Sequence, residues 1–126
     1  MKVIFSLKFK DIENTPEQFI AAQFLELVLG LKITYCEGKY LGKKEDSLMV
    51  DDAGNKDIDL IKRIAKQFKQ ESILLVNGNN NRVYLFYFDT ETTEHIGQWT
   101  ETTKEVAETK LGYTRDLETD KYFIVG

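Results

Sequence analysis

The sequence has very little cysteine, proline or histidine. Among its 126 residues there is one of each, namely Cys36, Pro16 and His95. A single cysteine excludes an internal disulfide and favours a reducing compartment. With one proline there is no proline-rich linker at which a second domain could begin. We therefore expect residues 1–126 to form a single domain.

Long apolar runs are also missing. No run approaches the ~20 residues that cross a bilayer. Residues 1–10 alternate apolar and polar side chains, which is unlike the unbroken apolar stretch of a signal peptide. These absences predict a cytoplasmic protein without a membrane partner. The net charge of −4 argues against broad binding to a nucleic-acid backbone.

No catalytic, metal or cofactor signature is present. His95 has only Glu91 and Glu94 close by as further ligands, and Cys36 has no adjacent histidine to activate it. Residues 38–44 lack the spacing and the Ser/Thr of a phosphate-binding loop. The sequence therefore predicts no bound metal, no cofactor and no catalytic residue, and it favours a non-enzymatic protein.

Strand and helix patterns fill most of the chain. Period-two alternation predicts strands, and their ranges are 3–9, 33–36, 47–50, 73–76, 83–88, 96–99, 113–117 and 122–125. Thr15 and Pro16 predict the start of a helix that ends at Gly30. Asp57 predicts the cap of a second helix, and residues 102–108 a short third one. This order predicts an α+β domain with a mixed, mostly antiparallel sheet and two main helices on one face.

Each main helix is expected to bury one apolar stripe. In the first helix the expected stripe consists of Phe19, Ile20, Phe24, Leu27 and Val28. In the second helix it consists of Leu60, Ile61, Ile64, Ala65 and Phe68.

The strand at residues 83–88 is apolar on both faces, which is unusual for a sheet that helices cover on one side. The sheet could curl around its own core, or the segment after Thr100 could fold over the second face. Alternatively, the second face is a surface for a protein partner or for self-association. The residues assigned to this surface are Tyr84, Phe86, Phe88 and Trp99.

The second helix has a row of basic side chains: Lys62, Arg63, Lys66 and Lys69. Such a row is typical of an ordinary solvated helix face. It could also contact phosphates, with Tyr40 or Trp99 stacking on bases, which makes nucleic acid an alternative partner.

Two polar patterns lead into predicted strands. They read Gly38-x-Tyr40-x-Gly42-x-x-Glu45-x-Ser47 and Phe68-x-Gln70-Glu71-Ser72-Ile73-Leu74. Together they resemble small uncharacterised domains of phages and other mobile elements. The resemblance implies a mobile-element origin and assigns no catalytic residue. If a phage encodes the protein, the expected location is the host cytoplasm.

If the strands that begin at Ser47 and Ser72 lie side by side, they are parallel, and the connection between them is right-handed. Glu45, Ser47, Gln70 and Ser72 then converge at one end of the sheet. Because ligands of open parallel sheets bind beyond the opposite strand ends, we expect a structural polar cluster. In it, Glu45 accepts hydrogen bonds from Ser72 or from backbone amides.

Three functions remain open. The first is a small non-enzymatic binding protein, such as a phage-encoded inhibitor of a host defence system or host enzyme. The second is a nucleic-acid-binding module that uses the basic row. The third is a small-ligand binder or enzyme that uses Glu45, Gln70 and Glu71.

Overall fold

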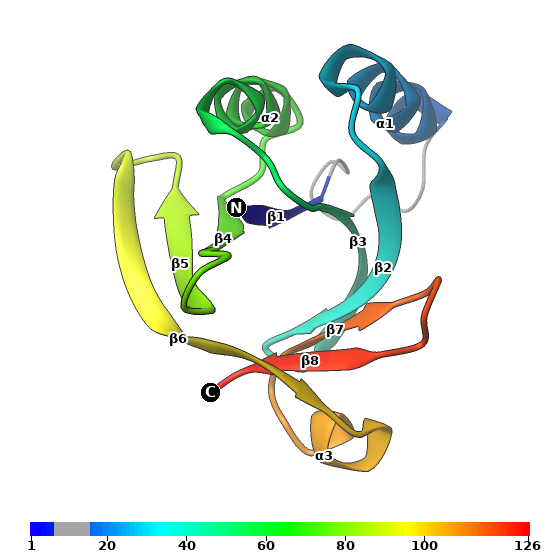
Figure 1. The fold of residues 1–126 in the computed structure, drawn as a ribbon, viewed down its shortest axis with the longest axis vertical. Coiled ribbons are helices and arrows are strands. Elements are labelled where there is room, and N and C mark those ends of the chain that lie inside the picture. Colours follow the sequence, from blue (N-terminus) through cyan, green and yellow to red (C-terminus); the bar gives the residue numbers. More distant parts are fainter. Residues whose placement is uncertain (7–15) are drawn as a thin grey trace.

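The computed structural model describes residues 1–6 and 16–126, with side chains from residue 20 onward in the first helix. In this part of the chain the strands close into a barrel (Figure 1). The strands are β1 (Lys2–Phe5), β2 (Ile33–Tyr40), β3 (Lys43–Val50), β4 (Ser72–Val76), β5 (Arg82–Tyr87), β6 (Thr92–Thr102), β7 (Tyr113–Asp116) and β8 (Tyr122–Val125).

The order of strands around the barrel is β1-β3-β2-β7-β8-β6-β5-β4, and neighbouring strands are antiparallel throughout. The predicted mixed, mostly antiparallel sheet with two main helices on one face is therefore wrong. The error has a physical origin, since the β7–β8 hairpin pairs with β2 on one side and with β6 on the other. These pairings join distant parts of the chain and leave no local sequence pattern.

The strands β3 and β4 do not lie side by side. The strand β1 runs between them and is antiparallel to both. The two strands therefore point in the same direction, as expected for a β-α-β unit, but they do not hydrogen-bond to each other.

Three helices lie outside the ring: α1 (Pro16–Leu29), α2 (Asn55–Gln67) and α3 (Lys104–Glu108). The helices α1 and α2 cover the outer side of the barrel near β1, and α3 lies across from them (Figure 1). In the core beneath α1 and α2, Leu25 and Ile61 pack with Val3, Val50 and Ile73. No described helix is long and apolar enough to cross a membrane.

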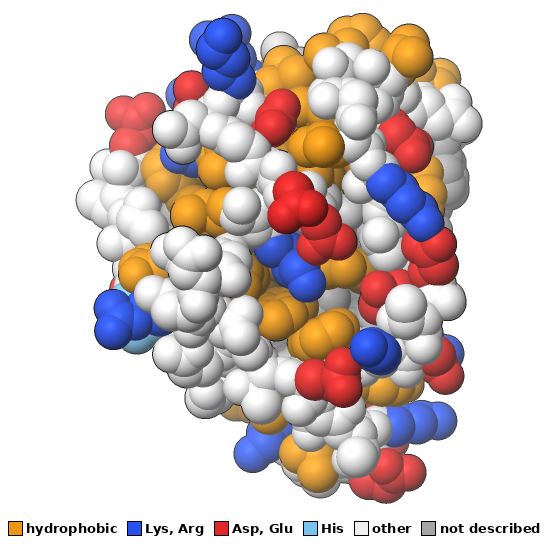
Figure 2. All heavy atoms as spheres, in the orientation of Figure 1, with side chains coloured by type: hydrophobic (Ala, Val, Ile, Leu, Met, Phe, Trp, Pro, Cys, Tyr) orange, Lys and Arg blue, Asp and Glu red, His pale blue; other side chains and the backbone are white. Residues whose placement is uncertain are grey.

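The first helix starts at Pro16 and stops at Gly30 (φ 65°), as predicted, but it buries a different face. Ala22 and Leu25 are buried, whereas the side chains of the predicted stripe that the structure describes are exposed: Ile20, Phe24, Leu27 and Val28. Phe19 lies outside the described side chains. Figure 2 shows hydrophobic side chains gathered on the surface over α1. Because the helix is apolar on both sides, helical spacing alone could not identify its buried face.

The second helix begins slightly earlier than predicted. Gly54 is the N-cap, and the Asp57 carboxylate accepts a hydrogen bond from the Gly54 backbone N–H at 2.8 Å. Asp57 is therefore the third helical residue of a capping box and not the cap itself. The predicted buried stripe is confirmed, with Ile61 and Ala65 fully buried.

The barrel interior holds a second core, in which Ile4, Met49, Val76, Val83 and Trp99 pack together with Cys36. It explains why β5 is apolar on both faces. Val83 points into the barrel, whereas Phe86 belongs to the core beneath the helices. The expectation that the sheet curls around its own core is confirmed.

Substitutions in α1 distinguish its two apolar faces. Leu25→Ala should lower the free energy of unfolding by about 2–5 kcal/mol, because it leaves a cavity in the core. Leu27→Ala is the matched control, since Leu27 is 82% exposed and should change stability by less than about 0.5 kcal/mol. Urea denaturation of both variants measures the difference. A larger loss for Leu27→Ala would contradict this placement of α1.

Candidate functional site

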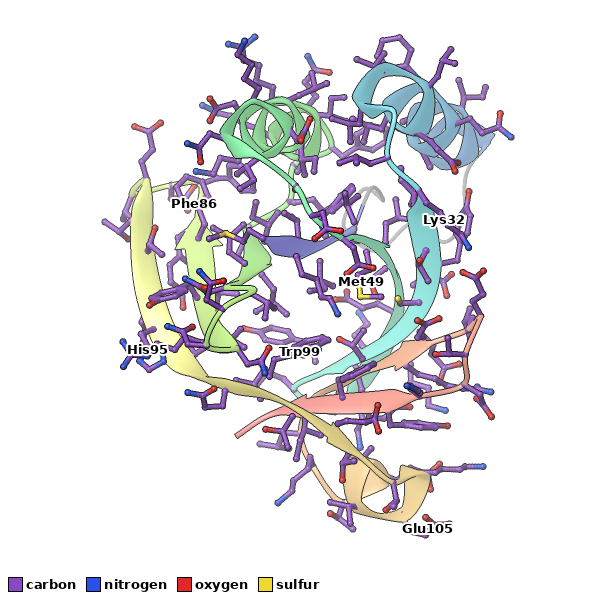
Figure 3. All side chains as sticks on the ribbon, viewed as in Figure 1. Lys32, Met49, Phe86, His95, Trp99 and Glu105 are labelled. Carbon is purple, nitrogen blue, oxygen red and sulfur yellow. The ribbon has the colours of Figure 1, made fainter. Side chains whose placement is uncertain are left out.

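One end of the barrel gathers three serines, Ser6, Ser47 and Ser72. Ile4 of β1 lies opposite Met49 of β3 and Leu74 of β4. Two residues from Met49 and Leu74 toward this end are Ser47 and Ser72, on the same inward side, and Ser6 follows directly after β1. Figure 3 shows Met49 pointing into the ring. We call the group Ser6, Glu45, Ser47 and Ser72 the serine end of the barrel.

The hydroxyl of Ser47 is the most unusual polar group at the serine end. It is buried and has no hydrogen-bond partner within the described part of the chain. By contrast, Ser6 Oγ donates to the Asp46 carbonyl at 3.1 Å. Gly38 faces Ser47 from β2, where a Cβ atom would lie 3.6 Å from Ser47 Oγ and 3.3 Å from the Glu45 carbonyl oxygen. A buried hydroxyl without a partner costs about 1–3 kcal/mol, so a ligand that pairs with it gains affinity.

The second polar pattern lies at the same end of the barrel. Glu45 on β3 is half-buried, and Glu71 is exposed just before β4. The Glu71 carbonyl accepts a hydrogen bond from the Phe88 N–H, and Gln70 Nε2 donates to the Phe68 carbonyl. No hydrogen bond joins Glu45 to Ser72 among the described residues. The two patterns therefore lie at the same end of the barrel, and the expected bond from Ser72 to Glu45 is not seen.

Two residues near the serine end were not assigned to it from the sequence: Tyr87, and Glu94, which was considered only as a neighbour of His95. Tyr87 pairs with Ser72 across β4 and β5 and therefore shares its face. The Tyr87 hydroxyl donates to Glu94 Oε2 at 3.1 Å, and this hydrogen bond raises the pKa of Tyr87. The alternating pattern of residues 83–88 was the available signal, but it does not show which strands meet in space.

The four residues of the basic row differ in exposure and contacts. Lys62 is half-buried, and its ammonium lies 3.9 Å from the centre of the Phe86 ring. Arg63, Lys66 and Lys69 are exposed. Lys62 thus covers the core instead of extending into solvent.

The four residues assigned to a partner surface do not share one surface. Phe86 is buried in the core beneath the helices, with Tyr84 and Phe88 packed against it. Trp99 lies inside the barrel. Several large apolar side chains are instead exposed together on α1.

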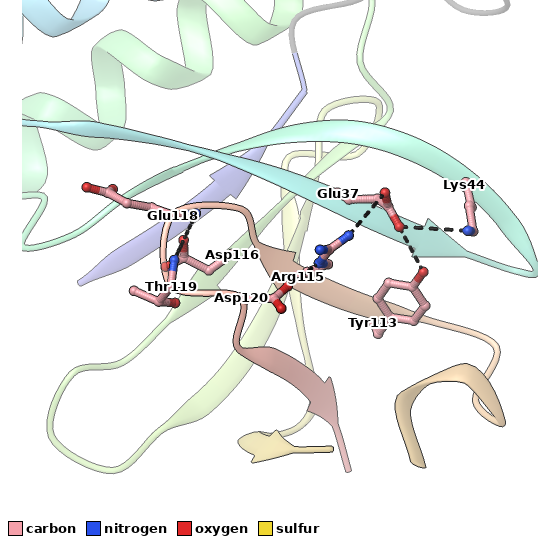
Figure 4. Close-up of polar contacts among 8 residues, drawn as sticks. All are labelled: Glu37, Lys44, Tyr113, Arg115, Asp116, Glu118, Thr119 and Asp120. Atoms are coloured by element: carbon pink, nitrogen blue, oxygen red, sulfur yellow. Dashed lines mark hydrogen bonds and ion pairs between the residues drawn. The ribbon is translucent and has the colours of Figure 1, made fainter. Parts of the chain in front are cut away.

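A charged cluster on the outside of the barrel connects β2 to β7 (Figure 4). The Glu37 carboxylate accepts a hydrogen bond from the Tyr113 hydroxyl at 3.1 Å and lies within 3.9 Å of Arg115 and 3.8 Å of Lys44. Arg115 also pairs with Asp120 at 2.7 Å. Because each of these charges has a partner, and Glu37 contacts both Tyr113 and Arg115 across the β2–β7 seam, the cluster has the properties of a structural clamp.

Two further sequence candidates take ordinary structural positions. His95 is exposed, lies against Tyr84 and has its Nε2 atom 3.1 Å from the Gly97 carbonyl oxygen. No group of metal-ligating side chains is present among the described residues. Cys36 is buried in the barrel interior, where burial raises the pKa of its thiol to about 12. A thiol held protonated in this way is a poor nucleophile.

The buried thiol makes stability depend on pH. Above the usual thiol pKa of 9.0, the unfolded chain releases the Cys36 proton, whereas the folded chain keeps it. This thiol should therefore lower the free energy of unfolding by ~1.4 kcal/mol per pH unit between about pH 9 and pH 12. Cys36→Ala should remove that part of the slope in urea denaturation across this range. Identical slopes for both proteins would contradict the assignment.

A comparison with protein-family models matches residues 7–126 to the S-Adenosylmethionine lyase family. No curated protein matches the chain significantly. The family is described by an enzymatic activity, which overturns the expectation of a non-enzymatic binding protein. Among the alternatives drawn from the sequence, this description favours an enzyme, and it assigns no residue to the activity.

Proposed function

Since the chain belongs to the S-adenosylmethionine lyase family, we propose that it cleaves S-adenosylmethionine at the serine end of the barrel. The observation that carries the choice of site is the unpartnered, buried hydroxyl of Ser47 beside the half-buried Glu45. Both residues belong to the polar patterns that distinguish the sequence. Ligand sites of small barrels commonly lie at a barrel mouth.

The chemistry of the substrate fits carboxylates above an apolar interior. S-adenosylmethionine is a sulfonium cation with an ammonium, a carboxylate, two ribose hydroxyls and an adenine ring. Glu45 and Glu71 would bind its cationic and hydroxyl groups, and the Ser47 hydroxyl would donate a hydrogen bond to one of its acceptors. Charge-assisted bonds of this kind orient the substrate.

A lyase breaks a carbon–sulfur bond of the sulfonium without adding water. The bonding electron pair passes to sulfur, which becomes a neutral thioether. The released carbon fragment completes its valence by closing on one of its own oxygens or by losing a proton. Because positive charge on sulfur disappears in this step, the low-dielectric interior formed by Met49 and Leu74 would favour the transition state over the charged substrate.

We also propose an anti-defence role for this activity. The family is associated with phages, and host methylation reactions consume S-adenosylmethionine, which many restriction enzymes also require. Removing that substrate would weaken host defence without any direct contact with a host protein.

Incubation with S-adenosylmethionine tests the activity. We expect the substrate to be consumed and 5′-methylthioadenosine to accumulate, as followed by liquid chromatography and mass spectrometry. In water enriched in ¹⁸O, a lyase places no ¹⁸O on the carbon that was bonded to sulfur. Label at that carbon would indicate a hydrolase, and unchanged substrate would overturn the proposed activity.

Carboxamide variants test the site. Glu45→Gln and Glu71→Gln should each lower kcat/KM by about 10–100-fold, equivalent to one charge-assisted hydrogen bond. Glu105→Gln is the matched control, because Glu105 is exposed on α3, which lies outside the ring (Figure 3). Equal activities of the three variants would place the reaction elsewhere.

Serine variants separate substrate binding from stability. Ser47→Ala should leave the free energy of unfolding unchanged or raise it, since its hydroxyl has no protein partner to lose, while raising KM roughly 5–10-fold. Ser6→Ala should instead lower the free energy of unfolding by about 1 kcal/mol through loss of its bond to Asp46. A loss of stability in Ser47→Ala with an unchanged KM would show a purely structural hydroxyl.

A further inference from the structure

The end of the barrel opposite the serines holds a lysine against aromatic rings. Lys2 Nζ lies 5.5 Å from the centre of the Trp99 ring and 5.4 Å from that of Phe123. The two rings are stacked, with their centres 5.0 Å apart. Lys2 is on the inward side of β1, two residues from Ile4, and its side chain is only 25% exposed. A cation is thus held at the barrel mouth over an aromatic floor.

The indole of Trp99 is a second hydrogen-bond donor at this end, in addition to the Lys2 ammonium. Its side chain is more than nine-tenths buried in the barrel interior, and within the described chain its indole Nε1–H has no acceptor. An indole nitrogen can only donate. Leaving such a donor unpaired in an apolar core lowers stability, and buried tryptophans usually find an acceptor.

The ion pair of Lys2 is loose. Its partner is Asp51, at 3.4 Å, and the Asp51 side chain is 57% exposed. Tight charge-assisted hydrogen bonds are about 2.7–2.9 Å long, so the Lys2 ammonium has donor capacity that Asp51 does not fill. Figure 2 shows basic and acidic side chains beside hydrophobic ones at the centre of the ring.

We propose that this end of the barrel binds a small oxyanion, a carboxylate or phosphate group, between Lys2 and Trp99. The oxyanion replaces Asp51 as the partner of the Lys2 ammonium and accepts a hydrogen bond from the Trp99 indole. The two groups with unused hydrogen-bonding capacity, the Lys2 ammonium and the Trp99 indole, are both donors. The site therefore selects an anion over a cation. The flexible Lys2 side chain, which lies over the rings, swings aside to open the path to the indole.

The site has a built-in reporter, because Trp99 is the one tryptophan of the protein. Inorganic phosphate and acetate are titrated separately at constant ionic strength while Trp99 fluorescence is recorded. We expect a saturable change with a Kd on the order of 1 mM for at least one of them. Saturation by phosphate alone identifies a phosphate site, and saturation by acetate alone identifies a carboxylate site. A linear response to both anions overturns the proposal.

Two variants with opposite expected effects make the test independent of folding defects. Lys2→Met should weaken binding by about tenfold or more, whereas Asp51→Asn should tighten it by removing the competing carboxylate. Lys104→Met is the control, since Lys104 is exposed at the start of α3. If Asp51→Asn weakens binding, or Lys104→Met weakens it as much as Lys2→Met, the site is not between Lys2 and Trp99. The titrations contain no S-adenosylmethionine, so their failure leaves the proposed lyase activity untouched.

Discussion

Closure of the barrel by the β7–β8 hairpin is the constraint on which the rest of the structure depends. The hairpin pairs with β2 along one edge and with β6 along the other, and the Glu37 carboxylate reinforces the β2 edge through the Tyr113 hydroxyl. Closure creates an enclosed interior, so inward residues such as Val83 and Trp99 need no partner protein to cover them. It also removes the unpaired edges that would otherwise promote aggregation. Both barrel ends then become the places where polar groups meet a dry core.

The sequence predicted the local elements of this fold and failed on its long-range pairing. Strands such as 73–76 and 83–88 and the helix that begins after Gly54 have clear periodicities, because each is decided by neighbouring residues. The pairing of β2 with β7 joins residues such as Glu37 and Arg115, which no local pattern relates. The buried face of α1 was misjudged for a different reason, since Leu25 and Leu27 are equally apolar and tertiary packing alone separates them.

The candidate site could be predicted in part. The polar patterns around Ser47 and Ser72 identified groups that the barrel brings to one end, although an intervening strand and not a direct pairing relates them. The positions of Tyr87 and Glu94 near the serine end could not be predicted, because they depend on the β4–β5–β6 register. The type of reaction could not be predicted from the sequence patterns either. A site built from carboxylates, hydroxyls and an apolar floor carries no spaced motif of the kind that marks a metal or phosphate site.

The location of the substrate is the central claim, and amide chemical shifts test it most directly. S-adenosylhomocysteine, the counterpart of S-adenosylmethionine with an uncharged thioether sulfur, is added to ¹⁵N-labelled protein. The account predicts that the largest changes in chemical shift cluster around Ser47, Ser72 and Gly38, which faces Ser47 from β2. Changes centred on Lys104 and the rest of α3, with the serine end unaffected, would contradict it.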